Sequence, residues 1–205
     1  GPVFVDDAKF LRQQTDRPIK WALPGPMTMI DTLSDRHYKS REKLAWEFAT
    51  ILNEEARELE AAGVDIIQFD EPAFNVFFDE VEDWGVAALE RAAEGLKAET
   101  VVHICYGYGI KANTDWKATL GAEWRQYERT FPLLQRSSID IVSLECQHSH
   151  VPIDLMDLLR GKKVMVGAID VASEVIETPD EVADVLRTAL QFVDADKLVA
   201  STNCG

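Results

Sequence analysis

The sequence predicts an α/β fold with a parallel sheet, built as a TIM (β/α)8 barrel, and three observations lead to it. Short, continuously apolar runs alternate with helical patterns, which is typical of a parallel sheet covered on both faces. No G-x-G-x-x-G or G-x-x-x-x-G-K motif follows any of these runs, so a nucleotide-binding open sheet lacks its usual signature. Polar and metal-ligating residues gather at the carboxyl ends of the runs, where a barrel places its site.

Six apolar runs are interpreted as buried strands. Each is short, apolar and bounded by turn or polar residues. They cover residues 18–23, 64–69, 100–105, 140–144, 163–168 and 198–201. A complete barrel has eight strands and about 250 residues. We therefore expect residues 1–205 to form a single, partial barrel domain, a fragment that lacks about the first two strands and the last helix.

The helices between these strands carry recognisable end signals. Ser40 can cap a long helix whose apolar residues recur at helical spacing, and Gly63 stands where its C-terminal cap belongs. Thr178, Pro179 and Glu181 supply a cap, a first-turn proline and a capping-box acid for a helix that ends near Val193. Further helices are expected over about residues 81–96, 116–135 and, in a shorter form, 153–159.

Composition limits the partners and the compartment. Asp and Glu number 36 against 21 Lys and Arg, which gives a net charge of −15 and argues against a nucleic acid or an anionic membrane as partner. No run approaches the roughly 18 apolar residues of a membrane helix, and no signal peptide opens the chain. Three cysteines cannot all pair, so free thiols or metal thiolates are expected. These features indicate a cytoplasmic protein.

Four candidate metal ligands stand at strand ends. His103 and Cys105 are two residues apart on a predicted strand and therefore share a face. Glu145 and Cys204 each follow an apolar strand, a costly place for an unpaired polar group. The four could bind zinc if their strands open on one barrel mouth. Cys146 is a rival to Glu145, and a hydrogen-bonded histidine beside core cysteines is the alternative to a metal site.

Such a zinc site would have a specific chemistry. Zinc with two thiolate ligands can hold a substrate thiol as the thiolate near neutral pH, and the thiolate is the nucleophilic form. A closed site with four protein ligands is usually structural. Catalysis therefore requires one ligand to move away, for which the harder Glu145 is the candidate, or an expanded coordination.

Several stretches, taken in chain order, carry a family resemblance. They are DAKFLRQQTDRPIKWALPGPMT at 7–28, LEAAGVDIIQFDEPAF at 59–74, HIC at 103–105, Glu145 at the end of its strand, and NCG at 203–205. In these motifs the chain resembles the C-terminal catalytic barrel of the cobalamin-independent methionine synthase family over nearly its whole length. The resemblance implies a TIM barrel with zinc held by His103, Cys105, Glu145 and Cys204, and it favours Glu145 over Cys146.

The resemblance also implies an activity and a substrate contact. It implies a zinc-dependent methyltransferase that activates the homocysteine thiolate and methylates it to methionine. It implies further that Asp70 contacts the amino group of homocysteine. Read from the sequence alone, Asp70 could equally be a turn carboxylate before Pro72.

Three positions depart from the folate-dependent members of the family. The residues that stack on the pterin, hold it and donate a proton correspond here to Thr32, Val76 and Ala172. The metal and homocysteine positions are kept. We therefore expect a short form of the enzyme whose methyl donor is not methyltetrahydrofolate, such as a methylated corrinoid protein or a donor that depends on another partner protein.

Two histidines follow Glu145 closely. His148 and His150 could replace the missing acid or face a donor protein, and His148 is the catalytic candidate beyond the metal site. The plain alternative is that both are exposed loop residues. Two other functions stay open, namely a zinc-thiol alkyltransferase that acts on another thiol such as coenzyme M, and a non-catalytic barrel with a structural zinc. Asp70, which suits an ammonium group, argues against coenzyme M.

Overall fold

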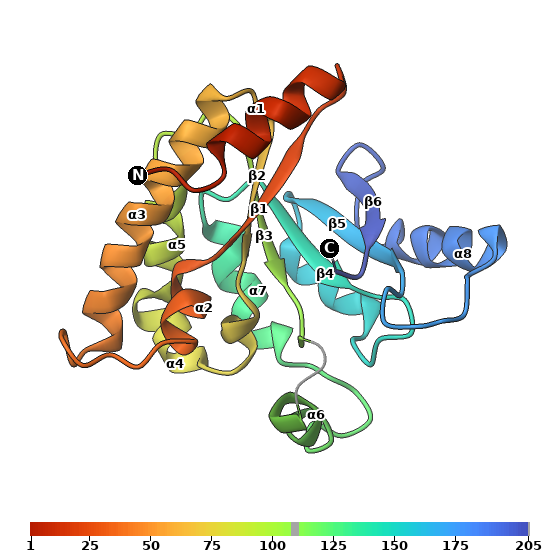
Figure 1. The fold of residues 1–205 in the computed structure, drawn as a ribbon. Helices are drawn as coiled ribbons and strands as arrows, with labels where there is room; N and C mark the ends of the chain where they lie inside the picture. Colours follow the sequence, from red (N-terminus) through yellow and green to blue (C-terminus); the bar gives the residue numbers. More distant parts are fainter. Residues whose placement is uncertain (108–110, 205) are drawn as a thin grey trace. The chain divides into compact units, whose positions relative to one another are not determined.

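The protein is described by a computed structural model, which covers residues 1–107 and 111–204 (Figure 1). Its centre is one parallel six-stranded sheet whose strands follow the order of the sequence. The strands are β1 (Lys20–Pro24), β2 (Ile66–Asp70), β3 (Glu99–Ile104), β4 (Ile141–Glu145), β5 (Lys163–Ile169) and β6 (Leu198–Thr202). All six predicted strands are confirmed, each within two residues at either end. Gly205, the last residue of the NCG motif, lies outside the described part.

The chain divides into two compact units. The first holds residues 1–103 with 137–140, and the second holds 104–136 and the chain from 141 on. The helices of the first unit are α1 (Val5–Gln14), α2 (Pro26–Asp31), α3 (Arg41–Ala61), α4 (Phe78–Glu80) and α5 (Val86–Ala93), with a 3-10 turn η1 (Pro72–Asn75) and a π turn η2 (Val81–Gly85). Of these, α1 and α2 are additions to the sequence prediction.

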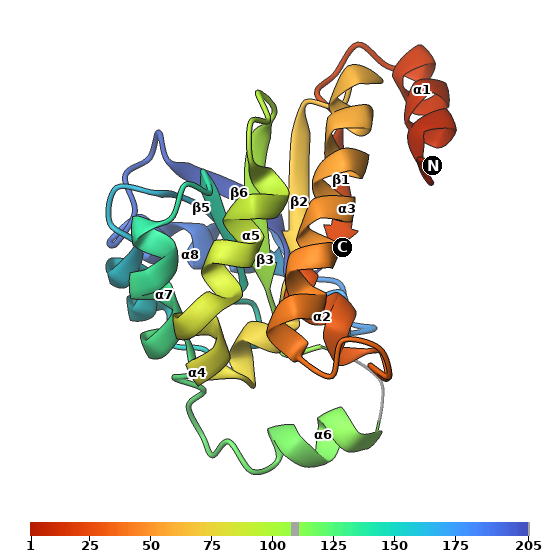
Figure 2. The same ribbon diagram turned by 90° about the vertical axis from the view of Figure 1, so that its left-hand side faces the viewer.

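In the first unit α3 packs along α5 (Figure 2). Both helices carry fully buried alanines, among them Ala49 and Ala56 of α3 and Ala88 of α5. The predicted ends of α3 are confirmed, because the Ser40 hydroxyl accepts from the Lys43 N–H and Gly63 has the positive φ of 98° that a C-terminal cap requires.

A buried carboxylate joins the ends of β1 and β2. Glu71 is fully buried and accepts the backbone N–H groups of Met27 at 2.9 Å and Thr28 at 2.8 Å, together with the Thr28 hydroxyl at 2.8 Å. It thereby satisfies the first turn of α2, where donors have no partner within the helix. Gly25 makes this possible, because a Cβ atom there would lie 2.2 Å from the Glu71 carboxyl carbon.

The helices of the second unit are α6 (Lys111–Lys117), α7 (Tyr127–Arg136) and α8 (Pro179–Ala189), with a 3-10 helix η3 (Ile153–Leu159). The prediction of one helix over 116–135 is wrong. Gly121 adopts a positive φ of 81°, and the Trp124 N–H donates to the His150 carbonyl instead of to a helix. The segment between α6 and α7 therefore runs as irregular chain. The capping box of Thr178 and Glu181 is confirmed.

Aromatic side chains form part of the core of the second unit. Tyr106 packs on Trp124 with ring centroids 4.6 Å apart, and Tyr127 stacks on Phe131 at 4.6 Å. The Tyr127 hydroxyl donates to the Ile104 carbonyl at 2.9 Å. Trp124 is therefore mainly a packing residue of this core.

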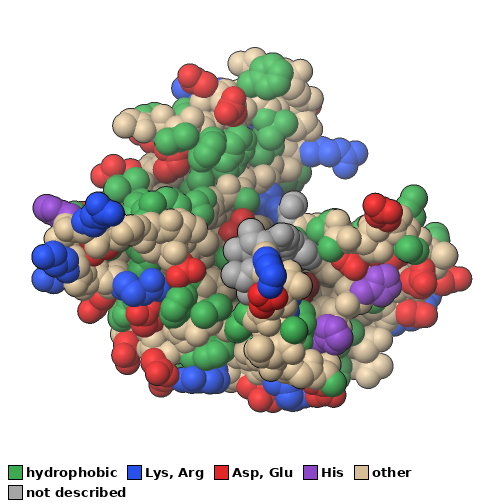
Figure 3. All heavy atoms as spheres, turned by 60° about the horizontal axis from the view of Figure 1, so that its bottom comes forward, with side chains coloured by type: hydrophobic (Ala, Val, Ile, Leu, Met, Phe, Trp, Pro, Cys, Tyr) green, Lys and Arg blue, Asp and Glu red, His purple; other side chains and the backbone are tan. Residues whose placement is uncertain are grey.

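Charged and apolar side chains are mixed on the face shown in Figure 3, where red acidic groups lie among blue basic ones. Among the described residues, we find no helix with the length and apolar character needed to cross a membrane.

The buried Glu71 leads to a prediction about pH. Burial raises the pKa of Glu71 from 4.5 to about 7, against the lowering effect of its hydrogen bonds. Between these two values the folded chain keeps a proton that the unfolded chain has released. We therefore expect the free energy of unfolding to fall as pH rises through this window, and Glu71→Gln to remove that part of the slope. Urea denaturation across the window measures it.

Glu42→Gln is the control for this prediction, because Glu42 is an exposed acid in the first turn of α3. It should leave the slope as in the unmodified chain. A slope that is the same in the Glu71→Gln protein would show that the buried carboxyl does not titrate in this window.

Candidate metal centre

Three of the four predicted ligands lie together at strand ends. One ligand atom from each of His103, Cys105 and Cys204 lies within 4.8 Å of the others. His103 belongs to β3 and Cys105 follows that strand directly, so the period of two places both side chains on one face. Cys204 stands two residues beyond β6, in the same compact unit as Cys105.

The surroundings of these side chains are largely dry. His103 is 3% exposed and Cys105 is 5% exposed, while Cys204 is half-buried. All three cysteines of the chain are free thiols, as the sequence predicts. One imidazole and two thiols in a buried cluster are a donor set that fits zinc, which favours nitrogen and sulfur ligands in tetrahedral sites.

The electrostatics of the cluster disfavour ionised thiols in the absence of a cation. The hydrogen bond to Cys204 and burial raise the pKa of the Cys105 thiol, and the negative charge of Glu145 raises it further. Ionised thiols would therefore be disfavoured without a positive charge close by. A divalent cation supplies that charge and stabilises the thiolate forms.

Glu145 lies near the cluster but outside the three-residue group. It ends β4 with only 5% exposure, and one of its oxygens accepts the Ser149 hydroxyl at 3.3 Å. Its rival Cys146 has its Sγ 3.9 Å from the Leu144 carbonyl, and burial raises the pKa of this thiol to about 12. Glu145 as a ligand stays a prediction, as does the ligation of the other three.

Asp70 is aligned with one of the candidate ligands. In the parallel pairing of β2 with β3, Asp70 is the register partner of His103, so the two side chains leave the same face of the sheet on neighbouring strands. The Gln68 side-chain amide donates to Asp70 at 2.7 Å and orients the carboxylate. Asp70 is half-buried, which leaves part of the carboxylate accessible. Its contact with an amino group stays a prediction.

The three positions that depart from the folate-dependent pattern have simple surroundings. Thr32 is the exposed C-cap of α2, where its hydroxyl donates to the Met29 carbonyl at 2.8 Å. Val76 is 46% exposed, and Ala172 is an exposed residue after β5. None of the three side chains offers an aromatic face or a titratable group.

His148 is held in a defined position after β4. Its φ of 53° is unusual for a residue other than glycine. The imidazole Nδ1 lies 3.4 Å from Asp170, and Nε2 lies 3.2 Å from the Gln147 side-chain amide. His150 instead packs against Trp124 in a tilted arrangement, with ring centroids 4.8 Å apart, and its Nδ1 lies beside the Ala122 carbonyl. His148 therefore has the more suitable setting for proton transfer, because a carboxylate orients its ring.

Two residues near the cluster had no predicted role. Ser149 contacts Glu145, and Asn203 precedes Cys204 with its side chain 3% exposed. In the sequence, the one feature that could have pointed to Asn203 is its place as a polar residue at a strand end, next to the predicted ligand Cys204. Its hydrogen-bond partners are distant in sequence, so their identity could not be read from local spacing.

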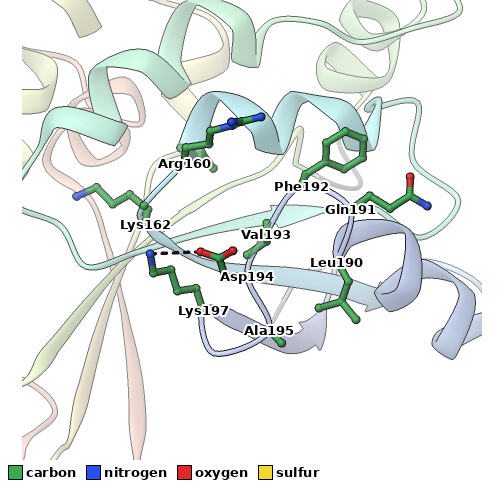
Figure 4. Close-up of a pocket in the computed structure, with 11 residues that line it drawn as sticks. Arg160, Lys162, Leu190, Gln191, Phe192, Val193, Asp194, Ala195 and Lys197 are labelled. Carbon is green, nitrogen blue, oxygen red and sulfur yellow. Dashed lines mark ion pairs between the residues drawn. The ribbon is translucent and has the colours of Figure 1, made fainter.

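A hollow of about 560 Å³ in the second unit lies elsewhere (Figure 4). It is lined by Lys162 and Lys197, which directly precede β5 and β6, and Lys197 pairs with Asp194 at 3.6 Å. The hollow is thus at the amino ends of these strands, whereas Cys204 follows a carboxyl end. In parallel barrels the carboxyl ends carry the active site.

Comparison with known proteins agrees with the fold and the motifs. Residues 2–205 match the family model described as cobalamin-independent synthase, catalytic domain. A methionine synthase from Sulfurisphaera tokodaii is 29% identical over 206 residues, and a 2-hydroxypropyl-CoM lyase from Xanthobacter autotrophicus is 32% identical over 228 residues. Both alignments cover 100% of this chain, but only 55% and 60% of the respective relatives.

Solved structures extend this comparison. The structure of a B12-independent methionine synthase from Shewanella sp. W3-18-1 in complex with selenomethionine is 80% identical with a TM-score of 0.96, and the match covers 100% of this chain and 60% of that one. A methyltransferase from Methanosarcina mazei shares the fold, with a TM-score of 0.67 and 16% sequence identity. The match covers 97% of this chain and 57% of that one.

These matches confirm the predicted fold class, a parallel α/β fold that is part of a TIM barrel. The six strands are fewer than the eight of a complete barrel, and the chain spans 60% or less of the relatives named above. With its family match over residues 2–205, the chain belongs to the cobalamin-independent synthases and lies within their catalytic domain.

Proposed function

We propose that the full-length protein is a zinc-dependent methyltransferase that converts homocysteine to methionine. The observation that carries this proposal is the cluster of His103, Cys105 and Cys204 within 4.8 Å, in a chain of the cobalamin-independent synthase family. The similarity to methionine synthases, one of them solved with selenomethionine, supports the reaction and the amino-acid substrate.

The metal would be held by His103, Cys105 and Cys204, with Glu145 as the fourth ligand. Zinc, when bound, supplies a Lewis acid that keeps a thiol ionised near neutral pH. Glu145 stands outside the close group and shares a hydrogen bond with Ser149, which suits a ligand that can give way to a substrate thiol. The buried setting of His103 and Cys105 keeps water from competing for the site.

Asp70 would recognise the substrate through its ammonium group. The carboxylate leaves the same face of the sheet as His103, on the neighbouring strand, and Gln68 orients it. An amino acid bound through its thiol at the metal could therefore present its ammonium group to Asp70. Such a charge-assisted hydrogen bond distinguishes homocysteine from thiols without an amino group.

A related thiol reaction is the second candidate. The relative named 2-hydroxypropyl-CoM lyase favours an alkyltransferase that acts on another thiol, such as coenzyme M. Coenzyme M has no ammonium group, so Asp70 would have no partner in that substrate. A barrel with a purely structural zinc is the third candidate, and in that case added homocysteine would leave the metal coordination unchanged.

The methyl donor is proposed to be other than methyltetrahydrofolate. Thr32, Val76 and Ala172 offer no stacking surface, pterin anchor or proton donor at the positions where folate-dependent members have them. A methylated corrinoid protein, or a donor that depends on another partner protein, asks less of the site because its leaving group needs no protonation. The acidic composition indicates that neither a nucleic acid nor a membrane is the partner.

The metal prediction uses all three cysteines. We expect about one zinc per full-length chain, with ligand distances of about 2.0–2.3 Å. Cys105→Ser and Cys204→Ser should each lose most of the zinc, because each removes a thiolate ligand. Cys146→Ser is the matched control and should keep zinc, since its Sγ lies beside the Leu144 carbonyl. Metal analysis of the purified proteins decides, and full occupancy in both ligand variants would reject the assignment.

The substrate prediction concerns Asp70. Asp70→Asn removes a charge-assisted hydrogen bond worth about 1.5–3 kcal/mol, so the KM for homocysteine should rise about 10- to 100-fold. Zinc content should stay the same, because Asp70 is not among the predicted ligands. Steady-state kinetics with homocysteine and metal analysis measure both effects, and an unchanged KM would remove Asp70 from the substrate site.

The donor prediction separates two methyl sources. The full-length protein with homocysteine should form methionine from methylcobalamin and not from methyltetrahydrofolate, because proton delivery to the folate amine alone is worth about 10²–10⁴ in rate. Efficient methionine formation from the folate would contradict this. In that event His148→Gln shows whether His148, oriented by Asp170, supplies the missing proton.

A further inference from the structure

Asn203 connects the ends of two strands through its side-chain amide. The oxygen Oδ1 accepts the backbone N–H groups of Cys146 at 2.9 Å and Gln147 at 3.2 Å. The nitrogen Nδ2 donates to the Gln147 carbonyl at 2.7 Å. Asn203 stands directly before Cys204, and Cys146 directly follows Glu145. The Asn203 amide therefore links the residue before the predicted ligand Cys204 to the two residues after the predicted ligand Glu145.

The backbone of Asn203 is also anchored to β5, the strand that lies between β4 and β6 in the sheet. Its N–H donates to the Ile169 carbonyl at 2.8 Å, next to a register shift between Gly167 and Ile169 in the pairing of β5 with β6. The Gly167 carbonyl in turn accepts the Gln147 N–H at 2.9 Å. All these contacts lie within the second compact unit.

Gly167 leaves the space that Asn203 fills. A Cβ atom at position 167 would lie 2.5 Å from Asn203 Oδ1 and 2.6 Å from Asn203 Cα, closer than any side chain can pack. Gly167 is the register partner of Glu145 on one side and of Ser201 on the other. The Asn203 amide thus occupies the place of a missing side chain beside the predicted ligand Glu145.

The side chain of Asn203 is suited to this task because it is both acceptor and donor. An aspartate keeps the acceptor oxygen but loses the donor to the Gln147 carbonyl, and an alanine loses all three hydrogen bonds. Asn203 is 3% exposed, so water cannot readily replace those bonds in the folded chain.

From these contacts we propose that Asn203 is a positioning residue for the metal centre. It holds the end of β6, and with it the Cys204 thiol, at a set distance from the end of β4 and the Glu145 carboxylate. Gly167 is required for it to do so. This inference rests on the proposed zinc site and adds to it a residue that is not itself a ligand.

The test measures the metal itself and not turnover. In the full-length protein, Asn203→Ala should release zinc to a chromogenic chelator about 10- to 100-fold faster, because removing a group that orients a ligand usually costs about that factor in metal affinity. With cobalt(II) in place of zinc, the thiolate-to-cobalt absorption should weaken or shift, because Cys204 is no longer held. Asn203→Asp keeps the two accepted hydrogen bonds but sets an oxygen against the Gln147 carbonyl in place of the donor, so its zinc release should also be faster than that of the wild type.

Asn53→Ala is the matched control. Asn53 is also buried, at 5% exposure, and its amide also makes three hydrogen bonds, to the Ala92 and Glu94 carbonyls and from Arg57. It belongs to α3 in the first unit. Its loss should lower the melting temperature and leave the cobalt spectrum and zinc release unchanged, which separates positioning from general stability.

Gly167→Ala tests the contact between Asn203 and Gly167 by changing the glycine. The added methyl group should displace Asn203 and reproduce the faster zinc release, and this variant decides the question if Asn203→Ala does not fold. The inference is overturned if a folded Asn203→Ala protein releases zinc at the wild-type rate and has an unaltered cobalt spectrum. If Asn203→Ala does not fold, the same result in Gly167→Ala overturns it. In either case the zinc site itself stays intact. A wild-type protein that binds no zinc would instead reject the proposed function.

Discussion

Parallel strand pairing is the constraint on which the candidate site depends. When strands run in one direction, their carboxyl ends meet at one edge of the sheet, and a residue at each end is brought near residues at the others. The register does this between Asp70 and His103 on β2 and β3, and between Glu145 and Gly167 on β4 and β5. A slip of one residue would turn every one of these side chains to the opposite face.

Buried polar side chains keep those strand ends in place. In the first unit Glu71 satisfies the start of α2 with a carboxylate, and in the second unit Asn203 joins the chain after β4 to the chain after β6 with an amide. Each is paired with a glycine, Gly25 or Gly167, whose missing side chain makes room for it. A buried polar side chain packed against a glycine therefore occurs at two strand ends of this chain.

The proposed reaction needs two sites, one that activates the thiol and one that binds the methyl donor. The cluster of His103, Cys105 and Cys204 and the alignment of Asp70 supply what a thiol nucleophile needs, namely a soft metal site and a place for an ammonium group. The site that would serve a folate donor has Thr32, Val76 and Ala172, which are simple surface residues here. A chain that keeps one site without the other is consistent with activation of the thiol and a different source of the methyl group.

Local sequence determined the strands, the caps of α3 and α8 and the pairing of His103 with Cys105, because period, capping residues and turn residues act over a few positions. The strand-end positions and the family resemblance named Cys204 and Glu145 as well, but only the tertiary structure showed that Cys204 lies close to that pair while Glu145 stands outside the close group, since this depends on strand ends 40 residues or more away in sequence. The tertiary structure also decided that residues 118–126 leave the helix, because the Trp124 N–H bonds the His150 carbonyl, and that Asn203 bonds Cys146 and Gln147. Partners so distant along the chain are chosen by packing, which no local pattern records.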